Sequence, residues 1–588
     1  MIEISRIEIE RGIILKILSV KIERFRSIKK ATIALQRMFA LVGANNAGKS
    51  HVLRALNAFF NFEEEKESFI NESHRYSKNS RPAITVVFTD IPAADIYSDF
   101  VRNGRLTIKF SYRWDRKNPT YEVILGSQER KSIDIEEFRK LIAGFEYIYI
   151  PIIRNYDAAF SSSSGIAYKL LKQIFSTQTF NRNTIQPIAD RLVKKVEDSI
   201  YRPALSKIQE YYPFSKSHKF DLHTYNADLI DLILKNVTLL FLEDSQENSI
   251  ENCGSGIQSA IYFAISIAIS FVKDKDFLVG IDEPELNMHP QAQRQLIESL
   301  KNADKYPRTS FIVTTHSTVI IDRLGHEAIA LCRKTKDSQR AVVTEIFQTP
   351  SDFLRKYSFD EERYYNFFDF KNSDFFFSKY IIITESPNDC KVIQTVLKIS
   401  GIDIEEEGIS LIPADGEKNI KYPYAIAKEL GIPFLCVVDR DVFQPYLRNI
   451  RKDSLDDDGI PQYKNEIKTS SPILELIEPE DQEKILNAYI MNKYDETLSI
   501  LWKYHIVSMR YALEVDLITC PSYCKAFYTA LNLSNTSDLN EMQKELLFDY
   551  DKKVKGYVLI NQVLNAKKCR NLPKSFKAVV KHIREMIE

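Results

Sequence analysis

The segment MFALVGANNAGKS, residues 38–50, constrains the fold of this 588-residue chain more than any other stretch. An apolar strand runs into a glycine-containing loop, and a helix is predicted to begin at Lys49. The loop GANNAGKS fits the pattern G-x-x-x-x-G-K-[ST], in which glycines let backbone N–H groups and a helix N-terminus face phosphate oxygens. This strand–loop–helix order predicts an α/β fold with a nucleotide site.

The bulk properties favour a multidomain globular protein. A chain of this length is too long for one core, so two to four domains are expected. The formal net charge is zero, so nucleic-acid binding has to come from local patches. Seven scattered cysteines and the absence of a secretory signal predict reduced thiols and a cytoplasmic location. The longest apolar run, 259–272, is shorter than the roughly 20 residues that a bilayer requires, so no membrane span is predicted.

Three further motifs support ATP and Mg²⁺ binding. The strand FLVGIDEP (277–284) ends in Asp282, predicted to hold the Mg²⁺ shell, and in Glu283, predicted to act as the general base. A second strand, SFIVTTHS, ends at His316, which is predicted to sense the γ-phosphate. The loop GSGIQSA (254–260) precedes an apolar helix and is suited to a γ-phosphate bound to another chain. The predicted ATP-binding residues are Gly43, Asn45, Asn46, Ala47, Gly48, Lys49, Ser50, Gly254, Ser255, Gly256, Asp282, Glu283 and His316, with Ser50 and Asp282 on the metal ion.

This order of motifs resembles the ABC-type ATPases of the SMC and RecF-like group. In that group the signature loop of one chain closes over nucleotide bound to another, so the resemblance implies a homodimer with two ATP molecules at its interface. The sequence CGSGIQ (253–258) stands where that group usually has Leu-Ser-Gly-Gly. Gly280, inside the strand before Asp282, is also unusual because glycine weakens strands.

Carboxylates also end two strands in the second half of the chain. IIITESPNDC (381–390) places Glu385 at a strand end and Asp389 one helical turn later, and FLCVVDRDVF ends a strand in Asp439 with Asp441 beside it. Mg²⁺ prefers carboxylate oxygens, and two ions can stabilise the attacking and leaving oxygens of a phosphodiester. Acidic residues often cap parallel strands, an explanation that we favour for one strand alone but not for both.

A strand glutamate, then ADG (414–416), then a strand Asp-x-Asp resembles a Toprim domain. An ABC head followed by Toprim resembles the OLD (overcoming lysogenization defect) family of nucleases, which includes nuclease subunits of anti-phage systems such as Gabija and certain retron effectors. The resemblance covers nearly the whole chain. It implies an ATP-regulated, Mg²⁺-dependent (or Mn²⁺-dependent) endonuclease acting on double-stranded DNA. A homodimer or higher homo-oligomer is implied, with a helicase, or a reverse transcriptase and its nucleic acid, as a defence partner.

The same resemblance implies further nuclease residues. ALEVDLI (512–518) is the best match for an additional acidic pair, and YDKKVKGY (550–557) for a lysine that stabilises the scissile phosphate, without choosing between its lysines. Ser386 stands where Toprim domains usually have glycine. The predicted catalytic residues are Glu385, Asp389, Asp439, Asp441, Glu514, Asp516, Lys553 and Lys555, with Glu283 in the ATPase site, and the six Toprim carboxylates are the predicted metal ligands.

The predicted fold class is an α/β ABC-type head with a helical insertion, followed by a Toprim α/β domain with a helical C-terminal part. The predicted boundaries are 1–160 and 244–375 for the two head lobes, 161–243 for a dimerising insertion, and 376–588 for Toprim. The basic stretch 552–588 is the predicted contact with the DNA backbone. Two alternatives remain open from the sequence: an ATPase scaffold with an inert Toprim site that recruits an effector, and a RecF- or SMC-like repair ATPase.

Overall fold

A computed structural model describes two compact units of this chain. The first comprises Met1–Leu41, Asn45–Arg323 and Cys332–Ile346, and the second Val42–Ala44, Leu324–Leu331 and Phe347–Glu588. The described residues are 15–152, 275–302, 308–336, 342–368, 375–448, 450–533, 538–567 and 571–588, with scattered positions between 191 and 268. Most of the predicted insertion, 161–243, therefore lies outside the described residues, and so do Ser255 and Gly256.

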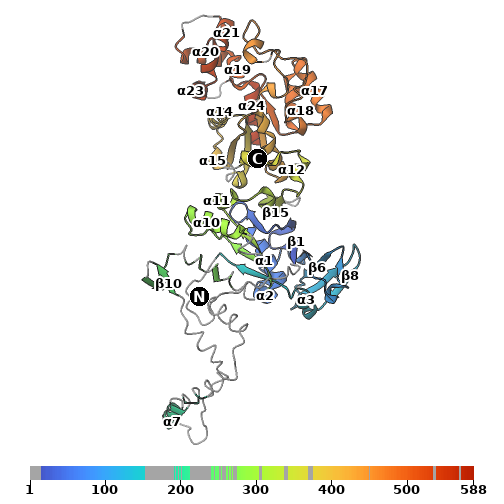
Figure 1. Ribbon diagram of the computed structural model, residues 1–588. Helices are drawn as coiled ribbons and strands as arrows, with labels where there is room; N and C mark the ends of the chain where they lie inside the picture. The colour runs from blue at the N-terminus through green and yellow to red at the C-terminus, as the bar shows by residue number, and fades with distance from the viewer. Residues whose placement is uncertain are drawn as a thin grey trace, which may run out of the picture. The chain divides into compact units, whose positions relative to one another are not determined.

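The first unit, here called the head, is built on a mixed sheet. Across the described part of the chain its strands follow the order β8 (Arg130–Ile133), β7 (Thr120–Ile124), β6 (Arg105–Ser111), β4 (Ala83–Thr89), β1 (Lys16–Phe25), β2 (Ile28–Ala34), β15 (Val342–Gln348), β14 (Ile329–Lys336), β3 (Met38–Val42), β13 (Thr309–Thr314), β12 (Asp276–Asp282) and β9 (Phe145–Ile150), with β5 (Val101–Arg102) beside β6. The flank from β2 to β8 is antiparallel, whereas β3, β13, β12 and β9 run parallel to one another. Figure 1 shows β1, β6 and β8 extending to one side of helix α1.

The parallel part of the head sheet carries the apolar strands predicted from the sequence. All residues of β3 and β12 are buried, as expected for parallel strands that are covered on both faces. Gly280 of β12 is explained by packing, because a Cβ there would lie 2.1 Å from the hydroxyl oxygen of Tyr147. The helices described in the head are α1 (Lys49–Phe60), α2 (Phe62–Ile70), α3 (Ile135–Leu141), α7 (Arg202–Tyr211), α10 (Pro290–Lys301) and α11 (Thr318–Ile321), and a separate hairpin pairs β10 (Leu240–Glu243) with β11 (Gln246–Ser249).

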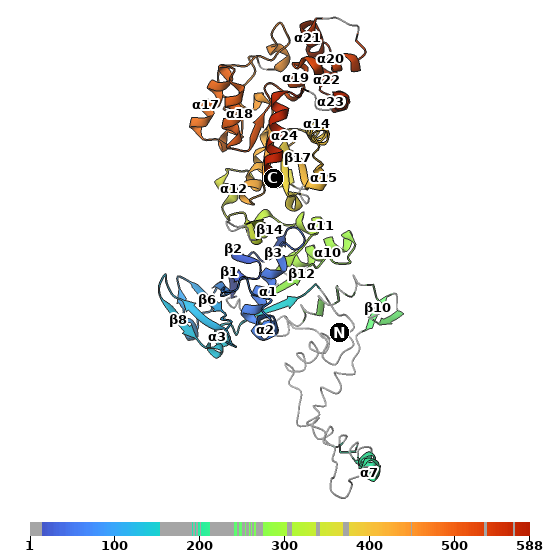
Figure 2. The ribbon, with the colours of Figure 1, turned by 180° about the vertical axis from the view of Figure 1, so that it is seen from behind.

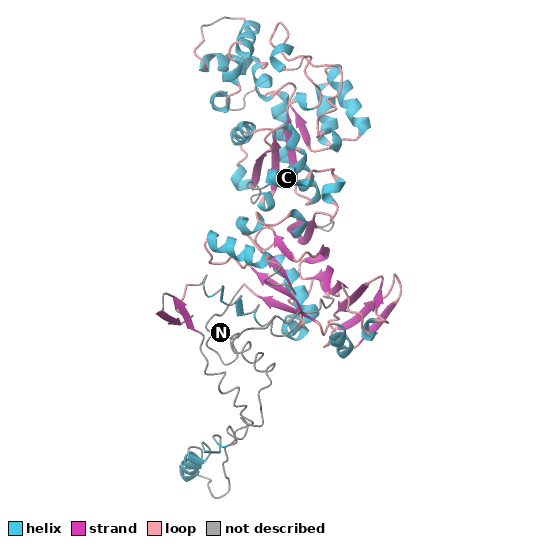
Figure 3. Ribbon diagram, in the orientation of Figure 1, coloured by secondary structure: helices cyan, strands magenta, loops and turns pink. Residues whose placement is uncertain are grey.

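The second unit has a parallel sheet of its own, coloured magenta among cyan helices in Figure 3. Its described strands follow the order β17 (Ile409–Pro413), β16 (Tyr380–Thr384), β18 (Phe434–Val438) and β19 (Ile506–Ser508). Successive side chains along each strand point to opposite faces of this sheet. Ile382, Leu435 and Val507 belong to the core that contains α14 (Pro387–Ile399) and α24 (Lys574–Ile587).

Helices cover this second sheet and extend beyond it. Figure 2 shows α14 and α15 (Ile404–Glu407) beside β17, and α16 (Lys421–Glu429) packs on β16 and β18. The remaining described helices are α12 (Phe353–Lys356), α13 (Glu361–Phe368), α17 (Pro479–Ile490), α18 (Tyr494–Trp502), α19 (Leu513–Ile518), α20 (Pro521–Ala530), α21 (Leu539–Phe548), α22 (Asp551–Val554) and α23 (Tyr557–Lys567). The predicted α/β class and the helical C-terminal part are confirmed. No helix among the described residues has the length and apolarity needed to cross a bilayer.

Candidate functional site

The nucleotide-binding loop lies between β3 and α1, where the sequence predicts it. Gly43, Asn46 and Gly48 have φ values of 138°, 61° and 99°. A Cβ on Gly48 would lie 2.5 Å from the hydroxyl oxygen of Thr344, and that hydroxyl donates a 2.9 Å hydrogen bond to the carbonyl of Ala47. The loop is therefore held in the curled form that turns N–H groups toward a phosphate.

Asp282 lies at the end of β12 and is surrounded by hydroxyl groups. The hydroxyls of Ser50 and Thr314 donate to its Oδ1 over 2.7 and 2.6 Å, and the hydroxyl of Tyr149 donates to Oδ2 over 2.8 Å. Burial raises the pKa of Tyr149, so this phenol stays a donor at neutral pH. The Ser50 hydroxyl and the Asp282 carboxylate are together the oxygen pair expected around a nucleotide-bound Mg²⁺, and the residues fit that ion.

Lys49, Glu283 and His316 also meet at this point. Nζ of Lys49 lies 2.6 Å from Nε2 of His316, which lies 3.7 Å from Oε1 of Glu283. Burial, followed by the charge of Lys49, lowers the pKa of His316, and burial lowers the pKa of Lys49. The predicted phosphate ligand, phosphate sensor and general base are thus neighbours. Of the three predicted ATP-binding residues in the signature loop, Gly254, Ser255 and Gly256, the structure describes Gly254, and it is exposed.

Glu285 is a residue that the sequence analysis missed. Its Oε1 accepts hydrogen bonds from the Thr315 hydroxyl (2.7 Å) and the His316 backbone N–H (2.8 Å). Its Oε2 is buried without a hydrogen-bond partner among the residues that the structure describes. Glu285 therefore fixes the position of the His316 backbone. Its place two residues after Glu283, directly after the motif 277–284, was the signal that could have revealed it.

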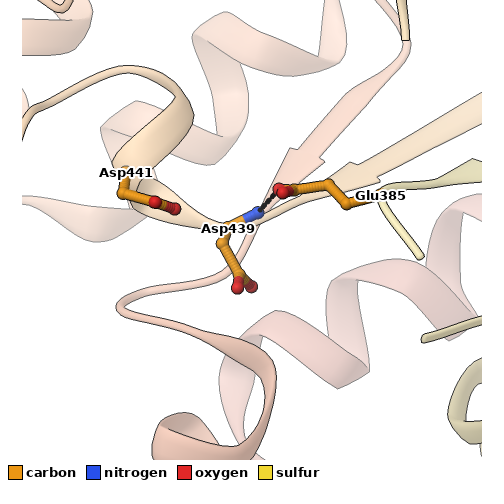
Figure 4. Close-up of side chains that lie close together, drawn as sticks. All are labelled: Glu385, Asp439 and Asp441. Atoms are coloured by element: carbon orange, nitrogen blue, oxygen red, sulfur yellow. Dashed lines mark hydrogen bonds between the residues drawn. The ribbon is translucent and has the colours of Figure 1, made fainter. Parts of the chain in front are cut away.

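The carboxylates of the second unit gather at the carboxyl edge of its sheet. Glu385 follows β16 and Asp439 follows the neighbouring parallel strand β18. The backbone N–H of Asp439 donates to Oε1 of Glu385 over 2.7 Å, as the dashed line in Figure 4 shows. One carboxylate oxygen from each of Glu385, Asp439 and Asp441 lies within 4.8 Å of the other two. In Figure 4, Glu385 and Asp441 point toward each other from either side of Asp439.

The electrostatics of this cluster favour a cation. Burial raises the pKa of Glu385 to about 8, and the charges of Asp441 and Asp389 add to that effect. Burial also raises the pKa of Asp439 well above its usual value, with Glu385 and Glu514 as the next causes. Carboxylates so crowded repel one another unless a positive charge lies between them. Three oxygen donors in this arrangement fit a hard divalent ion such as Mg²⁺ or Mn²⁺.

Ser386 and Asp389 form a capping box at the start of α14. The Asp389 carboxylate accepts from the Ser386 N–H (2.9 Å), and the Ser386 hydroxyl accepts from the Asp389 N–H (3.3 Å). Ser386 has an extended backbone, with φ −136° and ψ 160°, so this turn does not need the conformational freedom of glycine. The serine therefore gives no reason to regard the site as inert. The role of Asp389 as a metal ligand stays a prediction.

The two residues of the predicted acidic pair, Glu514 and Asp516, lie in different surroundings. Glu514, at the start of α19, is an ion-pair partner of Arg451. Asp516 is 3% exposed and accepts hydrogen bonds from the N–H groups of Arg510 and Tyr511 and from the Ser575 hydroxyl. These contacts tie the turn before α19 to the start of α24. Metal binding by Asp516 stays a prediction, and the structure does not bring it into the carboxylate cluster.

The predicted phosphate-binding lysines lie around α22. Nζ of Lys555 is 2.9 Å from Asp551, whose other oxygen is 3.6 Å from Arg451. Nζ of Lys553 lies 5.3 Å from the ring centre of Tyr550. Lys555 is thus linked through Asp551 to Arg451, and the choice between Lys555 and Lys553 stays open.

Two charged side chains near Asp441 had no signal in the sequence. Nζ of Lys468 lies 2.6 Å from Oε2 of Glu417. After burial, which raises the pKa of Asp441, the charge of Lys468 is the largest influence and lowers it, while that of Glu417 raises it. Lys468 and Glu417 are 51 residues apart. Local spacing therefore gave no indication that they would meet beside Asp441.

Three of the four lysine and arginine side chains of α24, within the basic stretch 552–588, have partners inside the chain. Lys574 pairs with Asp495, Nζ of Lys581 lies 3.6 Å from Glu585, and Arg584 donates to the Ser400 carbonyl over 2.8 Å. Lys568 and Arg570 lie outside the described residues. These pairings reduce the positive charge that this helix offers to a DNA backbone, and the predicted contact stays untested.

Two segments of the chain match models of known protein families. Residues 38–322 match the domain family described as "AAA domain, putative AbiEii toxin, Type IV TA system". Residues 376–441 match the family described as "Overcoming lysogenization defect protein-like, TOPRIM domain". The first match contains the loop, Asp282 and His316, and the second contains Glu385, Asp439 and Asp441.

Three curated proteins are similar to this chain over aligned segments of different length. The Old nuclease of Escherichia phage P2 is 24% identical over 494 residues, which cover 75% of this chain and 80% of that protein. The Endonuclease GajA of Bacillus cereus strain VD045 is 21% identical over 460 residues, covering 73% and 75%. The OLD nuclease of Thermus scotoductus is 30% identical over 193 residues, covering 33% and 36%. A solved SMC head domain from Thermotoga maritima aligns with 57% of this chain and 99% of its own at 14% identity, with a TM-score of 0.31.

Proposed function

Because this chain belongs to the OLD family, in which an ATPase head precedes a Toprim unit, we propose that it is a metal-dependent DNA endonuclease regulated by ATP. The observation that carries the proposal is the meeting of Glu385, Asp439 and Asp441 at one sheet edge. Its relatives are named nucleases, and the likeness to GajA supports a role in anti-phage defence. The proposed substrate is double-stranded DNA in the cytoplasm.

The proposed nuclease site divides its work among residues of the second unit. Glu385, Asp439 and Asp441 would hold Mg²⁺ or Mn²⁺, which when bound supplies Lewis-acid activation of water and charge neutralisation at the phosphodiester. The Asp439 N–H orients the Glu385 carboxylate by its 2.7 Å hydrogen bond. Lys555, or Lys553, contributes a positive charge for the scissile phosphate. Asp389 and the Ser386 hydroxyl fix the turn that presents Glu385.

The proposed ATPase site uses the residues that converge in the head. Lys49 and the loop N–H groups would bind the phosphates, and Ser50 and Asp282 would hold Mg²⁺. Glu283 takes the proton of the attacking water, while His316, positioned by Glu285, contacts the γ-phosphate. We propose that the loop 254–256 of a second copy completes this site, giving a homodimer or higher homo-oligomer. A helicase, or a reverse transcriptase with its nucleic acid, is the proposed defence partner.

Plasmid cleavage tests the proposed function. The full chain with Mg²⁺ or Mn²⁺ should nick or linearise supercoiled plasmid, and Asp439→Asn should lower that rate about 100-fold or more, which corresponds to about 2.7 kcal/mol of lost transition-state stabilisation. Glu406→Gln, at an exposed position in α15, is the matched control and should cut like the unaltered chain. Cleavage by Asp439→Asn at the unaltered rate contradicts the proposal.

A further inference from the structure

Arg451 forms a shielded ion-pair cluster beside the proposed nuclease site. Its Nη1 pairs with Oε1 of Glu514, and its Nη2 lies 3.6 Å from Oδ1 of Asp551. The Arg451 side chain is 13% exposed and that of Glu514 is 9% exposed. Charges so shielded from water are costly to separate, so this arginine is held in place by its partners.

The Arg451 cluster adjoins the three carboxylates rather than lying elsewhere on the surface. The backbone N–H of Leu513 donates to Oδ1 of Asp439 over 3.0 Å, which places Glu514, the next residue, beside Asp439. The ion pair between Glu514 and Arg451 therefore adjoins the site.

The backbone that carries Arg451 is fixed by hydrogen bonds of its own loop. The Ser454 hydroxyl accepts from the Arg448 N–H (2.8 Å) and donates to the Ile450 carbonyl (2.9 Å). The Gln462 N–H donates to the Ser454 carbonyl over 2.7 Å. The backbone of Arg451 thus belongs to a hydrogen-bonded turn, which restricts the positions that its guanidinium can take.

A guanidinium in this position competes with a metal ion for Glu514. Arginine keeps its charge at any pH at which the protein is folded, and its fork of N–H groups matches a carboxylate. A divalent ion bound to Glu514 would lie against this fixed positive charge and would have to displace it. Within the described chain, no ion pair of this kind engages Glu385, Asp439 or Asp441, and backbone N–H groups are the donors to the first two.

We infer that Arg451 supplies a fixed positive charge in place of a second metal ion, so that each Toprim unit binds one divalent ion, on Glu385, Asp439 and Asp441, instead of two. This inference rests on the proposed function and changes one expectation from the sequence, since Glu514 is an arginine partner and not a ligand of a second ion. It assigns Arg451 a place in the reaction: a fixed cation on the Glu514 side of the phosphodiester.

Counting bound Mn²⁺ tests the inference without any measurement of cutting. The free Mn²⁺ signal in electron paramagnetic resonance is titrated with the nucleotide-free full chain, and the count for Asp439→Asn is subtracted as the background of other sites. The unaltered chain should bind one ion above that background. Arg451→Met should bind two, because Glu514 then lacks its arginine partner, and Arg451→Met/Glu514→Gln should return to one. Arg448→Met, at an exposed arginine of the same loop, should stay at one.

A second variant keeps the test decisive should Arg451→Met fold poorly. Glu514→Gln keeps a hydrogen-bond acceptor for Arg451, and it should leave both the count and the affinity of Mn²⁺ unchanged within about twofold, a change of about 0.4 kcal/mol. Two ions on the unaltered chain, or a lost ion in Glu514→Gln, would overturn the inference. Two ions together with carboxylate-dependent plasmid cleavage would overturn the inference alone, whereas cleavage that ignores Asp439→Asn would overturn the proposed function.

Discussion

Replacing Glu385 by glutamine should stabilise the metal-free second unit at alkaline pH. Burial and the neighbouring carboxylates raise the pKa of Glu385 from 4.5 to about 8. Because the folded-state pKa is raised, the stability that this carboxyl contributes is fully present below pH 4.5 and is lost as the pH rises through about 8. Glutamine carries no charge at any pH, and its side-chain oxygen can accept the hydrogen bond from the Asp439 N–H.

The size of the effect follows from the difference between the folded and unfolded pKa of Glu385. A tenfold change in an acid dissociation constant is worth about 1.4 kcal/mol, so between pH 4.5 and pH 8 ionisation of Glu385 costs the folded state about 4 kcal/mol. At pH 8 without metal, the free energy of unfolding of Glu385→Gln should therefore be higher than that of the unaltered protein by up to about 4 kcal/mol. This difference should shrink toward pH 5. Divalent ions should reverse the order, because the unaltered carboxylate binds them better than the amide does.

Urea unfolding followed by tryptophan fluorescence can measure this difference in the second unit alone. The chain has two tryptophans, Trp114 in the head and Trp502 in the second unit. In a Trp114→Phe background with EDTA, Trp502 reports the unit that contains Glu385. Glu406→Gln provides the control for loss of an exposed charge. Identical profiles for Glu385→Gln and the unaltered chain between pH 5 and pH 8 would refute the crowded-carboxylate account.

Three further predictions concern packing, positioning and capping. Gly280→Ala should destabilise the head by about 1–3 kcal/mol in urea unfolding, because its Cβ would meet the Tyr147 hydroxyl, and Tyr147→Phe should recover part of the loss; full stability of Gly280→Ala would contradict this packing. Glu285→Ala should lower kcat for ATP hydrolysis about tenfold with little change in KM, because it leaves the His316 N–H without its acceptor (about 1–3 kcal/mol), and an unchanged kcat would exclude the positioning role. Ser386→Gly should change stability by only a few tenths of a kcal/mol and should not raise the rate of plasmid cleavage, whereas a tenfold gain would mean that serine impairs the site.

The sequence could predict the positions that a local pattern defines. The loop before Lys49, the strand ends at Asp282 and Glu385, and the order of the two domains follow from apolar runs that end in glycines or carboxylates. Because parallel strands bring their carboxyl ends to one sheet edge, the meeting of Glu385 with Asp439 was also predictable. These inferences need only strand periodicity and adjacency.

Contacts made across long loops were beyond the reach of such patterns. Arg451 meets Glu514 over 63 positions of sequence, and nothing in its loop distinguishes it from the exposed Arg448. Asp516 shares a motif with Glu514, but the turn before α19 directs its carboxylate to backbone N–H groups. The space above Gly280 depends on Tyr147, a residue of another strand. Each of these depends on packing between distant segments and not on spacing within one.

Anomalous scattering from crystals of the full chain grown with Mn²⁺ would test the central claim most directly. The account predicts an anomalous peak within coordination distance, about 2.0–2.6 Å, of oxygens from Glu385, Asp439 and Asp441, and none between Arg451 and Glu514. The peak should disappear in Asp439→Asn crystals. Full Mn²⁺ occupancy elsewhere in the second unit, with no density among these three carboxylates, would contradict the account.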